Sequence, residues 1–225
     1  MRPHDEQVLA ILPAGAHADP GDDALLAERL EAEIAAGFRQ LAGVERGISV
    51  FGSARARPGD PDYELARQVA ARLGREGFAI ITGGGPGIME AANRGARDVG
   101  ALSVGLPITE RLNAYLDLSL RFRHFFTRKL MFVRYASAFV IFPGGFGTLD
   151  ELFELASLAQ SGKLSARSIV LVRRAYWEPL FEWLRGSVLA AGNISAADLE
   201  LFSFADAEDE VAASVATSRG EDMTA

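Results

Sequence analysis

The 225-residue sequence contains no cysteine, only three histidines and only two lysines, and each shortage excludes a class of chemistry. Without cysteine there is no thiol nucleophile, no thiolate metal ligand and no redox switch. The histidines are His4, His17 and His124, and the first two lie in an aperiodic Pro/Gly/Ala/Asp-rich segment, which argues against a zinc site or a Ser-His-Asp triad. A Schiff-base enzyme would depend on Lys129 or Lys163, and neither has a supporting context. We expect no metal and no cofactor.

Basic residues are fewer than acidic ones. The sequence has 23 Lys and Arg and 30 Asp and Glu, so the net charge is −7. Surfaces that bind nucleic acids gain affinity by neutralising many phosphates, so we expect no nucleic-acid partner, whereas a small anionic ligand is compatible with this charge. The sequence has no apolar run near the roughly 18 residues of a membrane helix. Its first ten residues carry charges where a signal peptide would be apolar. These features predict a cytoplasmic protein that does not bind membranes.

Short β-rich runs alternate with helical stretches beyond residue 43. Strands are expected at 48–53, 78–84, 101–108, 118–124, 138–144 and 168–173, and helices at 22–40, 63–77, 87–99, from about 128, from 148 and, with its tryptophans, after 173. This alternation is typical of a single Rossmann-like, doubly wound α/β fold with a mostly parallel sheet and helices on both faces. We expect one domain over residues 22–214, with mobile tails at 1–21 and 215–225.

Two glycine-rich loops, at 82–87 and 143–148, each follow a predicted strand and open a predicted helix. Backbone without side chains lets a phosphate or ribose approach closely, and the helix dipole adds positive potential there. The alternative is that these glycines only permit tight turns, but two such loops at one sheet edge favour a phosphorylated ligand. Neither loop is a Walker A sequence or a GxGxxG after the first strand, which argues against kinases, ATPases and dehydrogenases.

The segment 121–134 contains five basic residues and no acidic one. Arg128 and Lys129 are expected in the first helical turn, where cations oppose the helix dipole unless an anion such as a bound phosphate compensates. The alternative is that they snorkel along the helix and pair with carboxylates, the fate that we expect for Arg121 and Arg123 on the preceding strand.

Thr148 and Glu151 have the spacing of a capping box, in which the two side chains satisfy each other's backbone N–H groups. A carboxylate beside a phosphate-binding helix start would repel the phosphate. Glu151 therefore acts either as a cap or toward another part of the ligand, such as a developing sugar cation.

Three sequence motifs resemble one family. The stretch GGGPGIMEAANRGA (83–96), the Arg-Lys pair at 128–129 and PGGFGTLDE (143–151) resemble the Lonely Guy phosphoribohydrolases, whose signature is PGGxGTxxE with an upstream Arg-Lys. The resemblance covers about residues 45–210. It implies hydrolysis of the N-glycosidic bond of an adenosine 5′-monophosphate, N6-modified forms included, to free base and ribose 5-phosphate. Relatives are often labelled lysine decarboxylases, a label that these residues do not support.

By the same resemblance, Arg128 and Glu151 are the catalytic pair. Glu151 would stabilise an oxocarbenium-like state while orienting water, and Arg128 would hold the phosphate or a ribose oxygen. Lys129 and the loop 145–148 would hold the ribose phosphate. The implied substrate-binding residues are Ser53, Gly84, Gly85, Met89, Glu90, Arg128, Lys129, Gly144, Gly145, Phe146, Gly147, Thr148 and Ser157. Ser157 stands where the family often has threonine.

Two other functions are compatible with the same residues. The loops could serve a nucleotide-binding or carrier protein without turnover, or a structural oligomer in which glycines only make turns. A homodimer or larger assembly is expected, because family sites lie near subunit contacts and because one segment is more apolar than a single helix face needs. That cluster comprises Phe125, Phe126, Met131, Phe132 and Tyr135.

Overall fold

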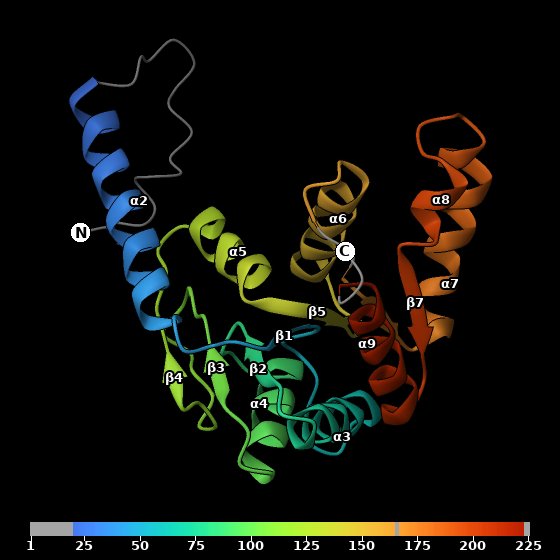
Figure 1. Cartoon of the computed structure of the whole chain (residues 1–225), viewed down its shortest axis with the longest axis horizontal. Helices are drawn as coiled ribbons and strands as arrows, with labels where there is room; N and C mark the ends of the chain where they lie inside the picture. The colour runs from blue at the N-terminus through green and yellow to red at the C-terminus, as the bar shows by residue number, and fades with distance from the viewer. Residues whose placement is uncertain (1–19, 165–166, 223–225) are drawn as a thin grey trace.

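The computed structural model describes residues 20–164 and 167–222. These residues form a seven-stranded sheet whose order is β4-β3-β2-β1-β5-β6-β7, and every neighbouring pair is parallel (Figure 1). The strands are β1 (Gly47–Phe51), β2 (Ala79–Thr82), β3 (Ser103–Gly105), β4 (Leu118–Ser119), β5 (Ala136–Ile141), β6 (Ile169–Val172) and β7 (Phe202–Ala205). The predicted doubly wound α/β fold is confirmed.

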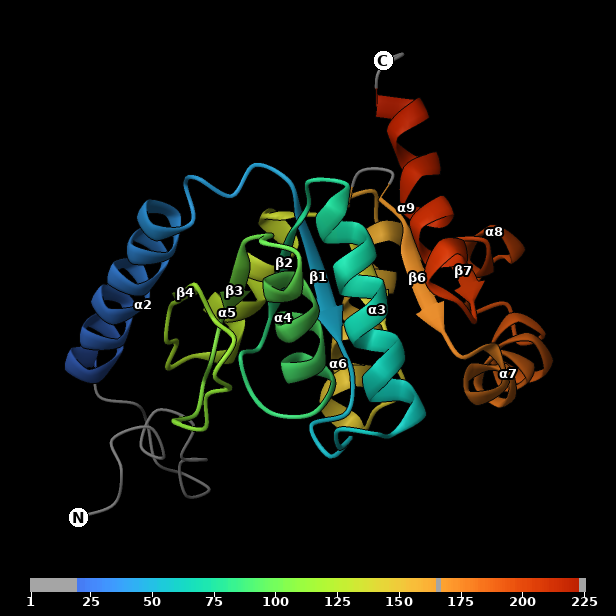
Figure 2. The same cartoon turned by 90° about the horizontal axis from the view of Figure 1, so that it is seen from below.

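Helices cover both faces of the sheet (Figures 1 and 2). Their bounds are α2 (Pro20–Gln40), α3 (Pro61–Arg75), α4 (Ile88–Asp98), α5 (Phe125–Arg134), α6 (Phe146–Gln160), α7 (Arg174–Trp183), a π-helical turn η1 (Leu184–Leu189), α8 (Ala196–Leu199) and α9 (Glu208–Asp222). Helices α3, α4 and α9 pack on one face, and α2, α5, α6 and α7 on the other. None of the helices in the described ranges is both long enough and apolar enough to cross a membrane.

Strand β1 shows how the sequence divides the core between the two faces. Ile48 and Val50 belong to the cluster under α3 and α4, whereas Phe51 joins the cluster under α5 and α6. Side chains alternate between faces along a strand, so the run must be apolar on both sides to be buried. The exception is Ser49, which is fully buried and donates its hydroxyl hydrogen to the carbonyl of Phe132 at 2.9 Å.

The strand order places a crevice at the carboxyl end of β1. From β1 the chain winds outward through β2, β3 and β4 on one side and through β5, β6 and β7 on the other. Such a switch point is where open α/β sheets bind ligands. Two backbone hydrogen bonds of 3.0 Å draw the loops together there, from Ser53 N–H to the Pro143 carbonyl and from Ile88 N–H to the Ser53 carbonyl.

Several boundaries differ from those expected from the sequence. The strand expected at 118–124 pairs only over β4, because its neighbour β3 ends at Gly105. Helix α5 begins at Phe125, three residues earlier than expected, and β7, α8 and α9 have no counterpart among the expected elements. Helix α9 crosses the boundary expected at residue 214, and Val215 is buried in the core rather than part of a tail. The expected N-terminal tail lies almost entirely outside the described residues.

Candidate active site

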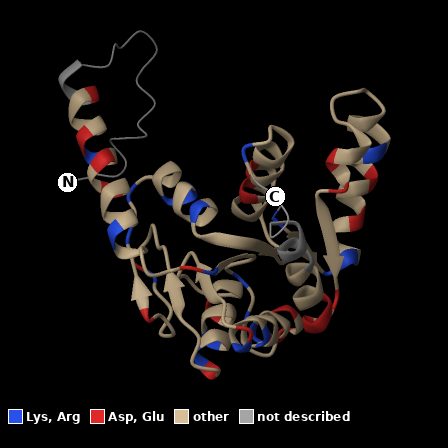
Figure 3. Cartoon of the chain, viewed as in Figure 1, with Lys and Arg blue, Asp and Glu red and all other residues tan. Residues whose placement is uncertain are grey.

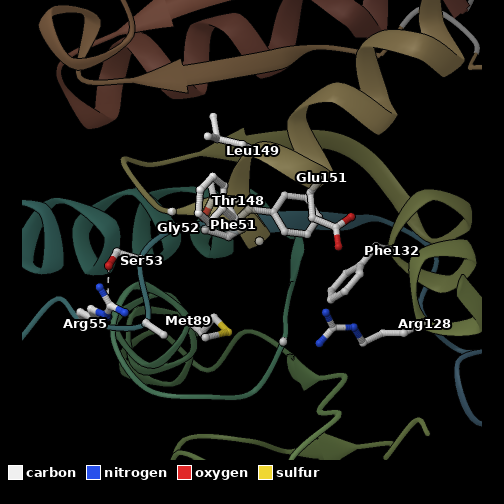
Figure 4. Close-up of a pocket in the computed structure, with 16 residues that line it drawn as sticks. Phe51, Gly52, Ser53, Arg55, Met89, Arg128, Phe132, Thr148, Leu149 and Glu151 are labelled. Carbon is white, nitrogen blue, oxygen red and sulfur yellow. Dashed lines mark hydrogen bonds between the residues drawn. The ribbon is translucent and has the colours of Figure 1, made fainter. Parts of the chain in front are cut away.

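A cavity of about 580 Å³ opens at the carboxyl ends of β1 and β5 (Figure 4). Its walls are residues 50–55, Gly83, Met89, two side chains of α5 and the residues 145–149 and 151. Small-molecule sites typically enclose about 300–1,000 Å³. The cavity therefore has the place and the size of a ligand site, and it joins segments that are about a hundred residues apart in the sequence.

Glu151 lies in the second turn of α6, and only 5% of the residue is exposed. Burial raises the pKa of its carboxyl to about 7, the positive charges of Lys129 and Arg128 oppose that rise, and the neighbouring carboxylate of Glu154 adds to it. A carboxyl with a pKa near neutrality exists in both protonation states at pH 7, which suits a general base.

Arg128 reaches the same cavity from the fourth position of α5. Its guanidinium carbon lies 5.1 Å from the ring centre of Phe125 and 5.4 Å from that of Phe132. Within residues 20–164 and 167–222, its buried Nε has no hydrogen-bond partner, and burial lowers the pKa of Arg128 although Glu151 opposes this. Figure 4 shows the guanidinium and the Glu151 carboxylate directed into the same space. A buried cation with an unused donor is suited to bind an anion.

Lys129 is not among the residues that line the cavity. Its Nζ lies 2.9 Å from Asp150 Oδ2 and 3.0 Å from Glu154 Oε2, so it links α5 to α6. Burial acts to lower the pKa of Lys129, but the hydrogen bonds to both carboxylates outweigh it and raise that pKa. The side chain expected to hold a phosphate is therefore placed instead between two carboxylates, which corresponds to the alternative left open for this basic segment.

The glycine loop after β5 divides into packed and open positions. A Cβ on Gly144 would lie 2.7 Å from Thr148 Cβ, whereas a Cβ on Gly145 or Gly147 would meet nothing within 4 Å. Neither Gly145 nor Gly147 has a positive φ. Because neither packing nor backbone conformation within this chain requires glycine at 145 and 147, the two positions fit close approach of a ligand to the backbone.

The expected capping box between Thr148 and Glu151 is wrong. Helix α6 begins two residues earlier, at Phe146, with Gly145 as its N-cap and no side-chain cap. The N–H groups of Thr148 and Leu149 donate to the Gly145 carbonyl at 2.9 and 3.0 Å. The N–H groups of Phe146 and Gly147 precede these first helical bonds, and both residues line the cavity.

The first glycine loop contributes through Gly83 and Met89, which line the cavity, whereas Gly84 and Gly85 do not. Gly84 has φ of 71°, and its carbonyl accepts a 2.9 Å hydrogen bond from Asn113 N–H. The Asn113 side chain donates to the Gly85 carbonyl at 3.0 Å. Gly84 and Gly85 thus shape the loop. The expected contact residue Glu90 also lies outside the cavity wall, where it accepts a 3.0 Å hydrogen bond from the hydroxyl of Tyr63.

Of the other expected contact residues, Ser53 and Phe146 line the cavity, whereas Gly144 and Ser157 do not. Ser53 lines the cavity, and its Oγ accepts a 3.1 Å hydrogen bond from Arg55 N–H. Phe146 stands at the wall with 92% of the residue exposed. Gly144 lines a neighbouring cavity, where its carbonyl accepts from Tyr176 at 2.7 Å. Ser157 is exposed outside the cavity and donates to the Phe153 carbonyl at 2.8 Å.

Phe51, Arg55 and Phe132 are among the wall residues that were not identified from the sequence. Phe51 and Phe132 meet edge to face, with ring centres 5.1 Å apart, and form an apolar wall. Arg55 follows β1 and adds a positive charge at the wall. The position of Phe132 four residues after Arg128 could have identified it, because residues i and i+4 share a helix face.

Comparison with known proteins gives three sequence findings. A family model described as "Possible lysine decarboxylase" matches residues 89–215. A cytokinin riboside 5′-monophosphate phosphoribohydrolase from Mycobacterium tuberculosis is 28% identical over 145 residues, covering 61% of this chain and 76% of that protein. A pyrimidine/purine nucleotide 5′-monophosphate nucleosidase from Escherichia coli is 33% identical over 109 residues, but the match spans 43% of this chain and 24% of that protein.

Solved structures share the fold at lower identity. A molybdenum cofactor binding protein from Rippkaea orientalis superposes with a TM-score of 0.58 at 22% identity, covering 77% of this chain and 96% of that one. A molybdenum cofactor carrier protein from Chlamydomonas reinhardtii also gives 0.58, at 20% identity, covering 78% of this chain and 99% of that one. Because one fold can host several functions, these similarities establish architecture alone.

Proposed function

This chain belongs to the family described as possible lysine decarboxylase, which includes the Lonely Guy phosphoribohydrolases, and from that premise we propose that it is a nucleotide N-glycosidase. Its substrates are purine nucleoside 5′-monophosphates, among them N6-modified adenosine 5′-monophosphates, and its products are the free base and ribose 5-phosphate. The observation that carries the proposal is the buried Glu151 carboxyl, with a pKa of about 7, in one cavity with Arg128 and the start of α6.

The phosphate of the substrate binds at the first turn of α6. The N–H groups of Phe146 and Gly147 precede the first intrahelical bonds, and the open space at Gly145 and Gly147 allows an oxygen to reach the backbone. The buried Nε of Arg128 supplies a donor to the phosphate or to a ribose oxygen. The apolar wall of Phe51 and Phe132 suits the face of a purine base.

Hydrolysis breaks the bond between C1′ of the ribose and the base nitrogen. The bonding electron pair leaves with the base, and positive charge develops on C1′ and the ring oxygen. The ionised Glu151 carboxylate stabilises that charge and accepts a proton from water as the water oxygen bonds to C1′. The base takes up one proton, Glu151 releases the proton that it accepted from water, and ribose 5-phosphate remains.

Lysine decarboxylation, which the family description mentions, finds little support in this chain. A pyridoxal-phosphate enzyme needs a lysine amine that is free to form a Schiff base. Lys129 is held between Asp150 and Glu154, and Lys163 is exposed outside the cavity. The two carboxylates keep the amine of Lys129 protonated, which is the unreactive form.

A homo-oligomer is part of the proposal. Large apolar side chains are exposed along α5 and α6, next to the cavity, and comprise Phe125, Phe126, Leu130, Phe146 and Phe153. We call this group the α5–α6 apolar surface. Contiguous exposed apolar patches mark interaction sites in soluble proteins. A second copy of the chain would cover this surface and close the cavity from outside.

The activity is tested by incubating the protein with AMP, N6-isopentenyladenosine monophosphate and CMP and separating the products by chromatography. We expect free base and ribose 5-phosphate in equal amounts from the purine nucleotides. If every nucleotide stays intact while AMP raises the melting temperature, the chain is instead a nucleotide-binding or carrier protein. If AMP is neither cleaved nor bound, the structural-oligomer interpretation replaces both.

A further inference from the structure

Helix α2 precedes the residues that the family model matches, and it packs closely against α5 (Figure 1). A Cβ on Gly37 would lie 2.6 Å from Cε of Met131, which is fully buried, so a larger residue there would require the end of the Met131 side chain to shift. The hydroxyl of Tyr135 donates to the Phe38 carbonyl at 3.3 Å. Helix α2 therefore packs directly against α5, the helix that carries Arg128.

The Glu33 carboxylate of α2 holds the start of α5 through three contacts. Its Oε1 accepts a 2.6 Å hydrogen bond from Arg123 N–H. Its Oε2 accepts from the Thr127 hydroxyl and lies 3.0 Å from His124 Nδ1. The side chains of Glu33 and His124 are only 12% and 6% exposed. Arg123 precedes the N-cap residue His124, and Thr127 is the third residue of α5, so these contacts span the first turn.

Helix α5 lacks the features that normally stabilise a helix start. Its N-cap residue His124 makes no side-chain cap, and its first turn contains no acidic residue. Figure 3 shows basic but no acidic residues on α5, and acidic residues on the neighbouring α2. Arg128 and Lys129 follow this turn directly, where their charges oppose the helix dipole. Glu33 supplies from another helix the negative charge and the acceptors that α5 does not provide itself.

We propose that Glu33 is a positioning residue, which fixes the first turn of α5 so that Arg128 points into the cavity toward the substrate. The proposal rests on the function proposed above for Arg128 and Glu151. Thr127, whose hydroxyl donates to Glu33, directly precedes Arg128. Lys129 directly follows Arg128 and is tied to α6 through Asp150. The arginine is therefore anchored on both sides by contacts with neighbouring helices.

The test compares Glu33→Gln with Glu31→Gln, an exposed glutamate on the same helix. A displacement of about 1 Å can reduce catalysis about 100-fold. We expect Glu33→Gln to lower kcat/KM for AMP by at least 10-fold at a temperature where the protein is fully folded, and Glu31→Gln to leave it unchanged. In the background of Arg128→Lys, the effect of Glu33→Gln should be less than 3-fold, because it acts through Arg128. Equal losses in both backgrounds would overturn the proposal.

Amide hydrogen exchange separates failure of this proposal from failure of the proposed enzyme activity, because it needs no substrate. Glu33→Gln should increase exchange at residues 125–130 relative to both the wild type and Glu31→Gln. If exchange there is unchanged, Glu33 does not fix α5, whatever the enzyme does. If exchange increases but the wild type cleaves no nucleotide, the positioning of α5 stands and the hydrolase proposal falls. Should Glu33→Gln not fold, Glu33→Asp keeps the charge with a shorter reach and gives the same comparison.

Discussion

The perturbed pKa of Glu151 predicts how folding stability changes when its charge is removed. The folded chain holds the carboxyl proton more tightly than the unfolded chain does, because the pKa rises from 4.5 to about 7. The stability from this proton is therefore complete below pH 4.5 and is lost as the pH rises through about 7. One pKa unit corresponds to about 1.4 kcal/mol, so ionised Glu151 costs the native state about 3 kcal/mol at pH 8.

Urea denaturation of the wild type and Glu151→Gln measures this cost, because glutamine mimics the neutral acid and does not titrate. We expect Glu151→Gln to be the more stable protein at pH 8, by about 3 kcal/mol at most, and this advantage to shrink by about 2 kcal/mol at pH 5. The control Glu182→Gln, at an exposed position on α7, should stay within about 0.5 kcal/mol of the wild type at both pH values. A Glu151→Gln advantage that is the same at pH 5 and pH 8 would refute the reasoning.

Three further predictions concern the cavity wall and the α5–α6 apolar surface. Gly147→Ala should raise the free energy of unfolding by about 0.5–1 kcal/mol in urea and weaken AMP binding in calorimetry, whereas Gly144→Ala should lower stability by about 1–3 kcal/mol by crowding Thr148. Unchanged AMP affinity in Gly147→Ala would contradict the phosphate position. Arg128→Lys should lower kcat/KM for AMP roughly 100-fold, because lysine cannot form bidentate contacts, and a loss under 3-fold would exclude that role. Phe126→Asp should reduce the mass in light scattering to that of the monomer, and an unchanged oligomer would show that another surface associates.

The sequence predicted the fold and the location of the cavity, because both follow from local patterns. Apolar runs bounded by glycine loops indicate strands that end at one sheet edge, and parallel order brings the loops at 82–87 and 143–148 together. Arg128 and Glu151 then meet in one cavity, as expected, although their catalytic roles stay predictions.

The remaining differences arise from contacts between distant segments. The start of α5 is contacted by Glu33, about 90 residues away, and no pattern within 121–134 indicates that contact. Lys129 meets Asp150 and Glu154 only because the fold brings α5 within reach of α6. The misassigned cap at Thr148 has a different origin, since glycine is itself an acceptable N-cap and Gly145 takes that position.

Release of adenine from AMP by the wild type and by Glu151→Gln tests the central claim most directly. The comparison is made at pH 8, with AMP binding by both proteins confirmed by calorimetry. We expect adenine and ribose 5-phosphate from the wild type and a rate roughly 10²–10⁴-fold lower from Glu151→Gln, because the glutamine amide cannot accept a proton from water. Equal rates from the two proteins, or no adenine from the wild type although AMP binds, would contradict the assignment of Glu151 as the group that drives hydrolysis.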